Sequence, residues 1–348
     1  MRQLFGRPVF SAGEVEYVWE DVLLASVLRG DWRDLEQLVR EELACARFLR
    51  ESGDEPPRDA VDEAAAEFRY DRNLVSAAET YAWLGRWGLE AGEWMAWIRR
   101  ALARKRAASR RAQALAECAP SADECAAALP VTLVCAGLAS RFLQAAAERA
   151  AALRAVGTPD ESSVHAMLAH VPADLAERGF GELSASRLAE RARVAARLEV
   201  AIERFRERAL TPKTLHHEVD GRHLDWIRVD YSSASFPTEG MAREAVLCVR
   251  DDGLELGDVA AEAGTQVVRA RRWLEEVDRE LRERLLAGRA GDLLGPVREN
   301  GGFLVHRIEA KRLPSLDDLD VRRRAEDSAL RHALAAAVND SVRWEVAP

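Results

Sequence analysis

The sequence predicts an α+β protein that is mostly helical, with helical N-terminal and middle blocks, one small α+β domain and a C-terminal helix. Three observations predict this fold class. Apolar residues recur every three to four positions from residue 14 onward, and we expect no strand in residues 1 to about 215. Apolar and polar residues then alternate from residue 224. A second alternating stretch, "GGFLVHRIEAK", follows near the end of the chain.

Composition limits the class of protein. The 348 residues are enough for two or three domains, because single cores stop growing at about 250–300 residues. A net charge of −9 argues against a nucleic-acid partner, which demands clustered basic residues. The chain shows neither a signal-peptide core nor about 18 apolar residues in a row, so we expect a cytoplasmic protein without membrane contact. Five cysteines without a CxxC pair suit free thiols.

The first block, residues 1–112, is predicted to be a helical domain. "EVEYVWEDVLLASVL" has apolar residues at helical spacing from Val15 onward, and Gly30 separates this helix from the next. Further helices begin at Asp59 and on either side of "GRWGLEAG". Four tryptophans gather there: Trp83, Trp87, Trp94 and Trp97. Such a cluster forms either the core of a helical bundle or a groove for an extended peptide.

The middle block, residues 113–218, is predicted to be a second helical domain. Pro120 and Pro130 bracket an expected linker, and long Ala-rich or charged helices follow it. The segment "LHHEVDGRH" (216–223 with Leu215) contains residue types that bind metals. We interpret it as a polar linker, because a metal site normally presents its ligands from a preformed element with supporting hydrogen bonds.

The third block, residues 219–315, is predicted to run strand, helix, helix, strand, helix, strand. In "LDWIRVDYSSASF" the alternation places Ile227, Val229 and Tyr231 on one face. A helix that ends at Gly288, a Gly-Pro-Val turn and the strand "GGFLVHRIEAK" complete the domain. Residues 316–348 are expected to form a C-terminal helix that packs back on the N-terminal domain. The apolar positions for this packing, four residues apart, are Leu330, Leu334 and Val338.

The stretch "LRERLLAGRAGDLLGPVRENGGFLVHRIEAKRLPSL" resembles the C-terminal half of a parvulin-type (PpiC-like) peptidyl-prolyl isomerase domain. The matching residues are Leu286, Gly288, Gly295, Pro296, Val297, Gly302, Phe303, Val305, Ile308 and Lys311. A helical block with tryptophans, then this domain, then a final helix is similar in order to SurA-like folding helpers. The resemblance implies a SurA-like domain over 1–112, a helical insertion over 113–218 and a degenerate parvulin-like domain over 219–315.

The catalytic pattern of that family is not carried over. Parvulins place one histidine at the start of the first strand and another after the aromatic residue of the last strand, and these positions here hold Trp226 and Leu304. His306 lies two residues further along, on the same face as Leu304 by strand alternation. We therefore predict no catalytic residues. The predicted peptide-binding surfaces are the tryptophan cluster and the sheet face around Trp226, Phe303, Leu304 and His306.

These observations predict a non-catalytic, SurA-like protein that binds an extended or unfolded polypeptide and needs no cofactor or metal. A specialised version holds a small, ribosomally made precursor peptide for its modifying enzymes. The alternative is an active prolyl isomerase or another peptide-modifying enzyme, in which His306, Asp225, Asp230 or Tyr231 takes over the lost chemistry. A third alternative is a self-assembling structural protein that uses the Ala-rich helices at 131–155 and 322–337.

Overall fold

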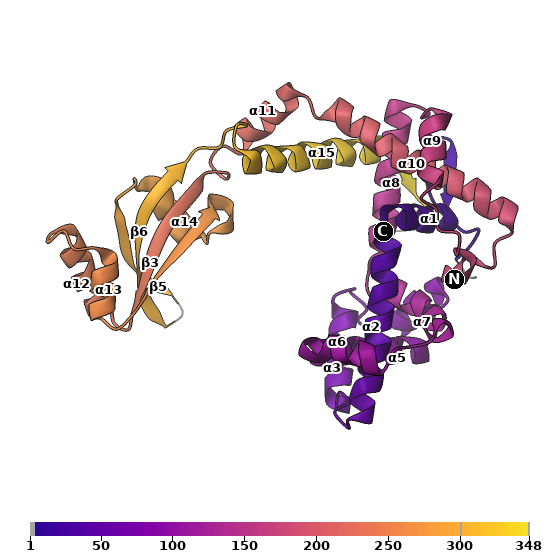
Figure 1. The fold of residues 1–348 in the computed structure, drawn as a ribbon, viewed down its shortest axis with the longest axis horizontal. Helices are drawn as coiled ribbons and strands as arrows, with labels where there is room; N and C mark the ends of the chain where they lie inside the picture. The colour runs from indigo at the N-terminus through magenta and orange to yellow at the C-terminus, as the bar shows by residue number, and fades with distance from the viewer. Residues whose placement is uncertain (1–3, 300, 347–348) are drawn as a thin grey trace. The chain divides into compact units, whose positions relative to one another are not determined.

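The computed structural model describes residues 4–299 and 301–346, which belong to two compact units. Unit 1 comprises the chain up to Arg208 together with the residues from Ala333 onward, and unit 2 comprises Ala209–His332. Helices predominate and two small antiparallel sheets accompany them, which confirms the predicted fold class (Figure 1). The middle block does not stand apart from the first. Residues of both share one hydrophobic core, in which Phe142 packs with Leu23 and Leu35 among many others.

Unit 1 contains strands that were not predicted. The strands β1 (Pro8–Ala12), β2 (Val15–Val18) and β7 (Val342–Trp344) form an antiparallel sheet in the order β2-β1-β7. The helix expected from Val15 begins only at Trp19. The hairpin turn needs Gly13, whose φ of +64° strains any other residue. Phe10 stacks on Tyr17 with ring centroids 4.9 Å apart. This cross-strand aromatic packing favours the hairpin over the predicted helix.

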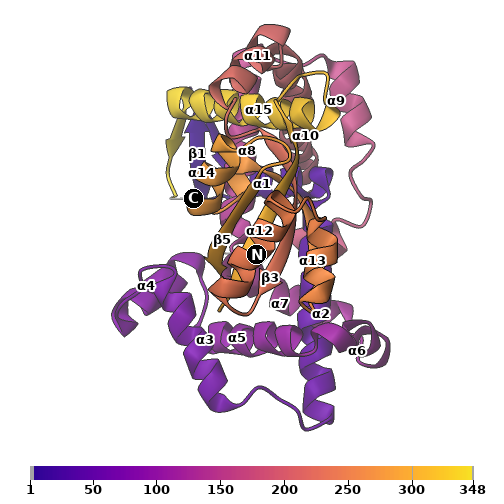
Figure 2. The same ribbon diagram turned by 90° about the vertical axis from the view of Figure 1, so that its left-hand side faces the viewer.

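Helices make up the rest of unit 1. They are α1 (Trp19–Arg29), α2 (Asp31–Glu51), α3 (Arg58–Tyr70), α4 (Ala77–Trp87), α5 (Ala91–Arg106), η1 (Ala108–Arg110), α6 (Arg111–Glu117), α7 (Ala122–Cys135), α8 (Leu138–Val156), α9 (Glu161–Leu168), η2 (Ala176–Phe180) and α10 (Ala185–Ala209). Figure 2 shows α5 crossing the long helix α2, and α6 and α7 also contact α2. This helical arrangement builds the core that supports the cleft described below.

The prediction of a linker between Pro120 and Pro130 is wrong, because helix α7 occupies most of this segment. Ser121 caps α7 by accepting a hydrogen bond from the Glu124 backbone N–H at 3.3 Å, and Pro130 lies inside the helix. A proline costs a helix one hydrogen bond, but Leu133 and Val134 beyond it are buried in the core, which offsets that cost. Within the described residues no single helix has the length and apolar character to cross a membrane. Only α7 and α8 taken together meet those criteria, as a pair bent by 71°.

Unit 2 is built on a four-stranded antiparallel sheet. Its elements are α11 (Pro212–Gly221), β3 (Arg228–Phe236), α12 (Glu239–Arg250), α13 (Leu256–Glu262), β4 (Val267–Trp273), η3 (Leu274–Glu276), α14 (Arg279–Ala287), β5 (Leu293–Glu299), β6 (Gly302–Arg312) and the first part of α15 (Leu319–Ser341). The strand order is β4-β3-β6-β5. Two expectations are corrected here. The segment 215–223, predicted to be a polar linker, lies largely in helix α11. The predicted Gly-Pro-Val turn lies within strand β5, where the register shifts between Leu294 and Val297.

The helices of unit 2 cover both faces of the sheet. Helices α12 and α13 pack on the face that carries Ala234, Phe236 and Val305. Helix α14 packs on the other face, which carries Val229 and Ile308. In Figure 1 the two groups of helices lie on either side of the strands. The alternation predicted for Ile227, Val229 and Tyr231 is confirmed, because all three belong to the cluster on the α14 face.

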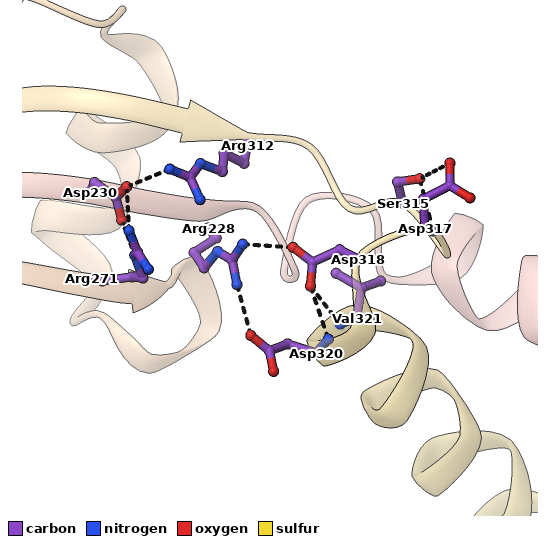
Figure 3. Close-up of polar contacts among 9 residues, drawn as sticks. All are labelled: Arg228, Asp230, Arg271, Arg312, Ser315, Asp317, Asp318, Asp320 and Val321. Carbon is purple, nitrogen blue, oxygen red and sulfur yellow. Dashed lines mark hydrogen bonds and ion pairs between the residues drawn. The ribbon is translucent and has the colours of Figure 1, made fainter.

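The first turn of α15 is tied to β3 (Figure 3). Asp318 Oδ1 accepts from the backbone N–H of Asp320 at 2.9 Å, and Asp318 Oδ2 accepts from Arg228 Nη2 at 2.6 Å. Asp320 binds the other terminal nitrogen of Arg228 at 3.0 Å. Arg228 and Arg324 also lie over the ring of Trp273, at 5.3 and 4.8 Å from its centroid. The start of α15 is therefore a fixed part of unit 2. Further along α15, Leu330 is half-buried, whereas Leu334 and Val338, in unit 1, are buried.

Candidate functional site

The structure divides the four clustered tryptophans into two pairs. Trp94 and Trp97, on α5, are buried and pack against Phe68, with ring centroids 5.5 and 5.7 Å away. Trp83 and Trp87, on α4, are only half-buried. The first pair belongs to the core of unit 1, and the second pair lines a cleft.

This cleft, which we call the tryptophan–arginine cleft, has a volume of about 520 Å³. All of its lining belongs to unit 1 and comes from the β1–β2 hairpin and its flanks, α3–α4, α7–α8 and the segment after β7. The lining residues are Leu4, Arg7, Trp19, Arg72, Trp83, Arg86, Trp87, Val134, Gly137, Ser140, Glu345 and Val346.

The indole wall of the cleft is positioned by helix α4. Ser76 and Glu79 form a capping box, in which the Ser76 N–H donates to Glu79 Oε2 at 2.8 Å and the Glu79 N–H donates to Ser76 Oγ at 3.2 Å. Trp83 and Trp87 are four residues apart and thus share one face of the helix. Their ring centroids lie 6.4 Å apart, and Trp19 meets Trp87 edge-on at 5.6 Å. Trp83 and Trp87 form the accessible part of this wall, whereas Trp19 is 1% exposed and belongs to the core on which Trp87 packs.

Arg72 is the most deeply placed cation of the cleft. Its Nη2 donates to the carbonyl of Cys135, the last residue of α7, at 2.9 Å, and its guanidinium lies 3.8 Å from the Phe68 ring centroid. Burial lowers the pKa of Arg72 from its usual value. Part of its role is structural, since a cation satisfies the carbonyls at a helix C-terminus.

Arg7 and Arg86 lie nearer the surface. Arg7 Nη1 donates to the Arg86 backbone carbonyl at 3.0 Å. The exposed Arg86 guanidinium forms no hydrogen bond to any described residue. Within residues 4–299 and 301–346, neither these two arginines nor Arg72 form an ion pair with a carboxylate. Three guanidiniums thus face one cleft that holds a single carboxylate, that of Glu345.

The chemistry of this cleft favours binding. Indoles take up apolar side chains, and unpaired guanidiniums bind carboxylates with two parallel hydrogen bonds. The described lining contains no histidine, cysteine or aspartate; its acidic residue is Glu345, and no hydrogen bond joins Glu345 to Ser140 in the described part of the chain. In the described part of the chain, no group of three or more His, Cys, Asp or Glu side chains could hold a metal ion.

The second predicted surface, in unit 2, is not one surface. Trp226 is 2% exposed and packs with Val219, Val321 and Ala325. Phe303 pairs with Phe236 on the face covered by α12 and α13. Leu304 and His306 point to the opposite face by strand alternation, as predicted for these two. The structure therefore does not bring Trp226, Phe303, Leu304 and His306 together.

His306 is a buried polar group on the α14 face of the sheet. It is 2% exposed, Ser233 Oγ lies 2.7 Å from its Nδ1, and Nε2 has no hydrogen-bond partner among the described residues. Tyr231 meets its ring edge-on at 5.7 Å. Burial lowers the pKa of His306 to about 4, with a smaller opposing effect of Asp278, so the imidazole is neutral at physiological pH.

Sequence reasoning missed the arginines of the cleft and Trp19. One signal was present: Arg86 stands between two of the tryptophans in "WLGRW", a basic residue interleaved with aromatics. Arg7 and Trp19 flank the β1–β2 hairpin, whose second strand was predicted to be part of a helix. Their position beside α4 depends on long-range packing and has no local signature.

No protein-family model matches the chain, and no curated protein matches it. Among solved structures, PrsA from Bacillus subtilis is 14% identical, with a TM-score of 0.22, over 62% of this chain and 86% of that one. The peptidylprolyl isomerase PrsA from Bacillus anthracis is 11% identical, with a TM-score of 0.26, over 56% and 94%. The foldase protein PrsA from Streptococcus pneumoniae is 13% identical, with a TM-score of 0.24, over 58% and 80%. The likeness is distant.

Proposed function

We propose that this protein binds polypeptide segments non-catalytically, in the manner of a chaperone, and that the tryptophan–arginine cleft holds a segment with an apolar side chain next to a carboxylate. The observation that carries the proposal is the pairing of two half-buried indoles, those of Trp83 and Trp87, with three guanidiniums that have no carboxylate partner among the described residues. A polypeptide supplies both complements within two or three residues.

The energetics suit reversible binding. Full burial of one apolar side chain in the cleft contributes about 1.5–3 kcal/mol, and a hydrogen-bonded carboxylate adds about 1 kcal/mol where the arginine is exposed. Such contacts tolerate many sequences, which is what a protein that holds varied or unfolded segments requires. Tyr70, Val75 and Tyr81 are large, exposed apolar side chains in and before α4, outside the lining of the cleft.

The burial of His306 supports binding without catalysis. A substrate cannot reach a side chain that is 2% exposed unless the sheet face and α14 separate. The carboxylates proposed for the isomerase alternative are also engaged, because Asp230 pairs with Arg271 and Arg312, and Asp225 pairs with Arg282.

A cytoplasmic location and a ribosomally made precursor peptide as the client remain predictions within this proposal.

Fluorescence anisotropy with two labelled peptides tests the proposal. One peptide alternates glutamate with phenylalanine, and its partner has lysine in place of glutamate. We expect the wild-type protein to prefer the acidic peptide and Arg86→Glu to weaken its binding about tenfold, because a guanidinium is replaced by a like charge. Arg99→Glu is the matched control, since Arg99 is exposed on α5 in the same unit and lies outside the cleft.

Equal effects of Arg86→Glu and Arg99→Glu would contradict the cleft as the binding site, because only the overall charge would then matter. Trp83→Leu should weaken the binding of both peptides, since it removes an indole from the wall of the cleft. Turnover of a proline-containing peptide by the wild-type protein, lost in His306→Ala, would contradict the non-catalytic part and restore the isomerase alternative.

A further inference from the structure

Strand β4 leaves one of its edges open. It is the outermost strand of the sheet in unit 2, and among the described residues it pairs with β3 alone. The Leu274 N–H donates to the Ile227 carbonyl at 2.9 Å, which makes these two residues a hydrogen-bonded pair. Hydrogen-bonded pairs alternate along an antiparallel ladder. The register therefore directs the backbone N–H and C=O groups of Val267, Arg269 and Arg271 away from β3, toward the open edge.

The open edge is basic. Val268, Arg269, Arg271 and Arg272 are all exposed. Arg271 pairs with Asp230 on β3, as Figure 3 shows, whereas Arg269 and Arg272 form no ion pair with any described residue. Arg323, on α15, is exposed and likewise has no carboxylate partner there. It lines a shallow cleft of about 390 Å³, in which the charged residues are Arg228, Arg271, Arg272, Arg323, Arg324, Glu276, Asp320 and Asp327. This local positive charge contrasts with the net charge of −9 of the whole chain.

We propose that the open edge of β4 binds an extended acidic polypeptide segment as an additional strand. The main-chain groups of Val267, Arg269 and Arg271 would give the affinity, and glutamate or aspartate at every second position would lie beside Arg269 and Arg271. Exposed edges pair with other strands unless something prevents it, and a row of arginines prevents pairing with a second basic strand. The same charges therefore disfavour β4 of another copy and favour an acidic partner.

This inference is independent of the proposed function, because β4 belongs to unit 2 and the tryptophan–arginine cleft to unit 1. It adds a second type of recognition, in which the protein forms hydrogen bonds with the backbone of the bound segment as well as contacts with its side chains. Failure of either proposal leaves the other intact.

The experiment uses a labelled peptide of alternating glutamate and valine, its lysine–valine counterpart, and the full-length protein. We expect the acidic peptide to bind and Arg269→Ala to weaken it about twofold to fivefold, the effect of one cross-strand charge pair. Arg269→Pro should weaken it at least about tenfold more, because proline also removes the outward N–H. Proline is tolerated where a strand's N–H faces solvent, so the β3–β4 ladder is retained. The Arg269 variants are compared in the Arg86→Glu background, because the tryptophan–arginine cleft would also take up a peptide with apolar side chains next to carboxylates.

Equal binding by Arg269→Ala and Arg269→Pro would overturn strand addition, since only the charge would then matter. A peptide N-methylated at alternate positions gives the same test on the unchanged protein: its binding should be lost, and retention would overturn the inference. Equally tight binding of a twelve-nucleotide single-stranded DNA would overturn it in favour of a general polyanion surface. A dimer in light scattering that Arg269→Pro dissociates would overturn it in favour of a second copy as the occupant.

Discussion

Glu42 is a carboxylate that the fold buries almost completely. It lies on α2 and is 2% exposed, and its Oε2 accepts from Thr132 Oγ1 of α7 at 2.9 Å. Burial raises the pKa of Glu42 to about 7, despite the opposing effects of the Thr132 hydrogen bond and of Arg100 and Arg104 on α5. The free energy of unfolding of unit 1 should therefore depend on the protonation of this side chain.

Between the ordinary pKa of 4.5 and the folded value of about 7, the folded protein binds the Glu42 proton more tightly than the unfolded chain does. The contribution to stability is complete below pH 4.5 and is lost as the pH rises through about 7. Glu42→Gln cannot lose a proton, so at pH 8 we expect it to be more stable than the wild type by up to about 3 kcal/mol. Urea unfolding at pH 5 and pH 8 measures this difference.

Glu41 is the control for this prediction. Although it lies next to Glu42, it pairs with Arg104, and its pKa is lowered, because the hydrogen bonds from Gln37 and Arg104 outweigh the effect of burial. Glu41→Gln should thus destabilise the protein at pH 8. Identical pH profiles for wild type and Glu42→Gln would show that Glu42 is ionised at little cost.

At the scale of elements, Asp318 both begins α15 and connects it to the sheet. Asp318→Ala removes the hydrogen bonds to the first-turn N–H groups and the ion pair with Arg228, and we expect a loss of about 1–2 kcal/mol in the free energy of unfolding of unit 2. Asp318→Asn keeps an acceptor for the N–H groups, so it should recover part of that loss. Urea unfolding gives the values, and no recovery in Asp318→Asn would show that the ion pair dominates.

The helices were predicted well because a single helix carries its own period. The strands of unit 2 were predicted where alternation is strong, as in "WIRVDY". Strand β5 was not, because "GP" normally marks a turn, and here the strand absorbs it through a register shift. Strands β1, β2 and β7 have only three to five residues each, and the aromatic packing that holds them joins Phe10 to Trp344, far apart in the sequence.

The candidate site was predicted only in part, for a related reason. Trp83 and Trp87 are neighbours in sequence and on one helix face, so their clustering was visible. Arg72 reaches the cleft through the α3–α4 connection, and Arg7 through the turn before β1, and neither contact has a local pattern. His306 and Leu304 were placed on a common face by alternation, but the burial of His306 depends on α14 packing over it, which the strand alone does not reveal.

At the scale of the whole molecule, unit 1 is completed by the last described residues. Strand β7 pairs with β1, Trp344 meets Phe10 edge-on at 5.8 Å, and the N–H groups of Glu345 and Val346 both donate to the Val9 carbonyl. Truncation after Ser341 should lower the free energy of unfolding of unit 1 by about 3 kcal/mol, the usual cost of removing a packed tryptophan.

Hydrogen exchange measured by mass spectrometry locates the effect of this truncation. The amides of Phe10–Ala12 should exchange faster, whereas those of β3 and β6 should be unchanged. Trp344→Ala in the full-length chain keeps the β7 backbone and separates the loss of the indole from the loss of the strand. Unchanged exchange in β1 after truncation would contradict a stabilising role for β7.

The pairing of β1 with β7 also has a consequence for the order of events at the ribosome. Phe10 is synthesised early and its partner Trp344 more than three hundred residues later, and all of unit 2 is made in between. Unit 2 can therefore fold while β1 still has an open edge and the N-terminal core is incomplete. During translation β1 cannot pair with β7 until residues 342–344 have been made. A nascent chain that stops before residue 342 therefore has a folded unit 2 and an incomplete unit 1.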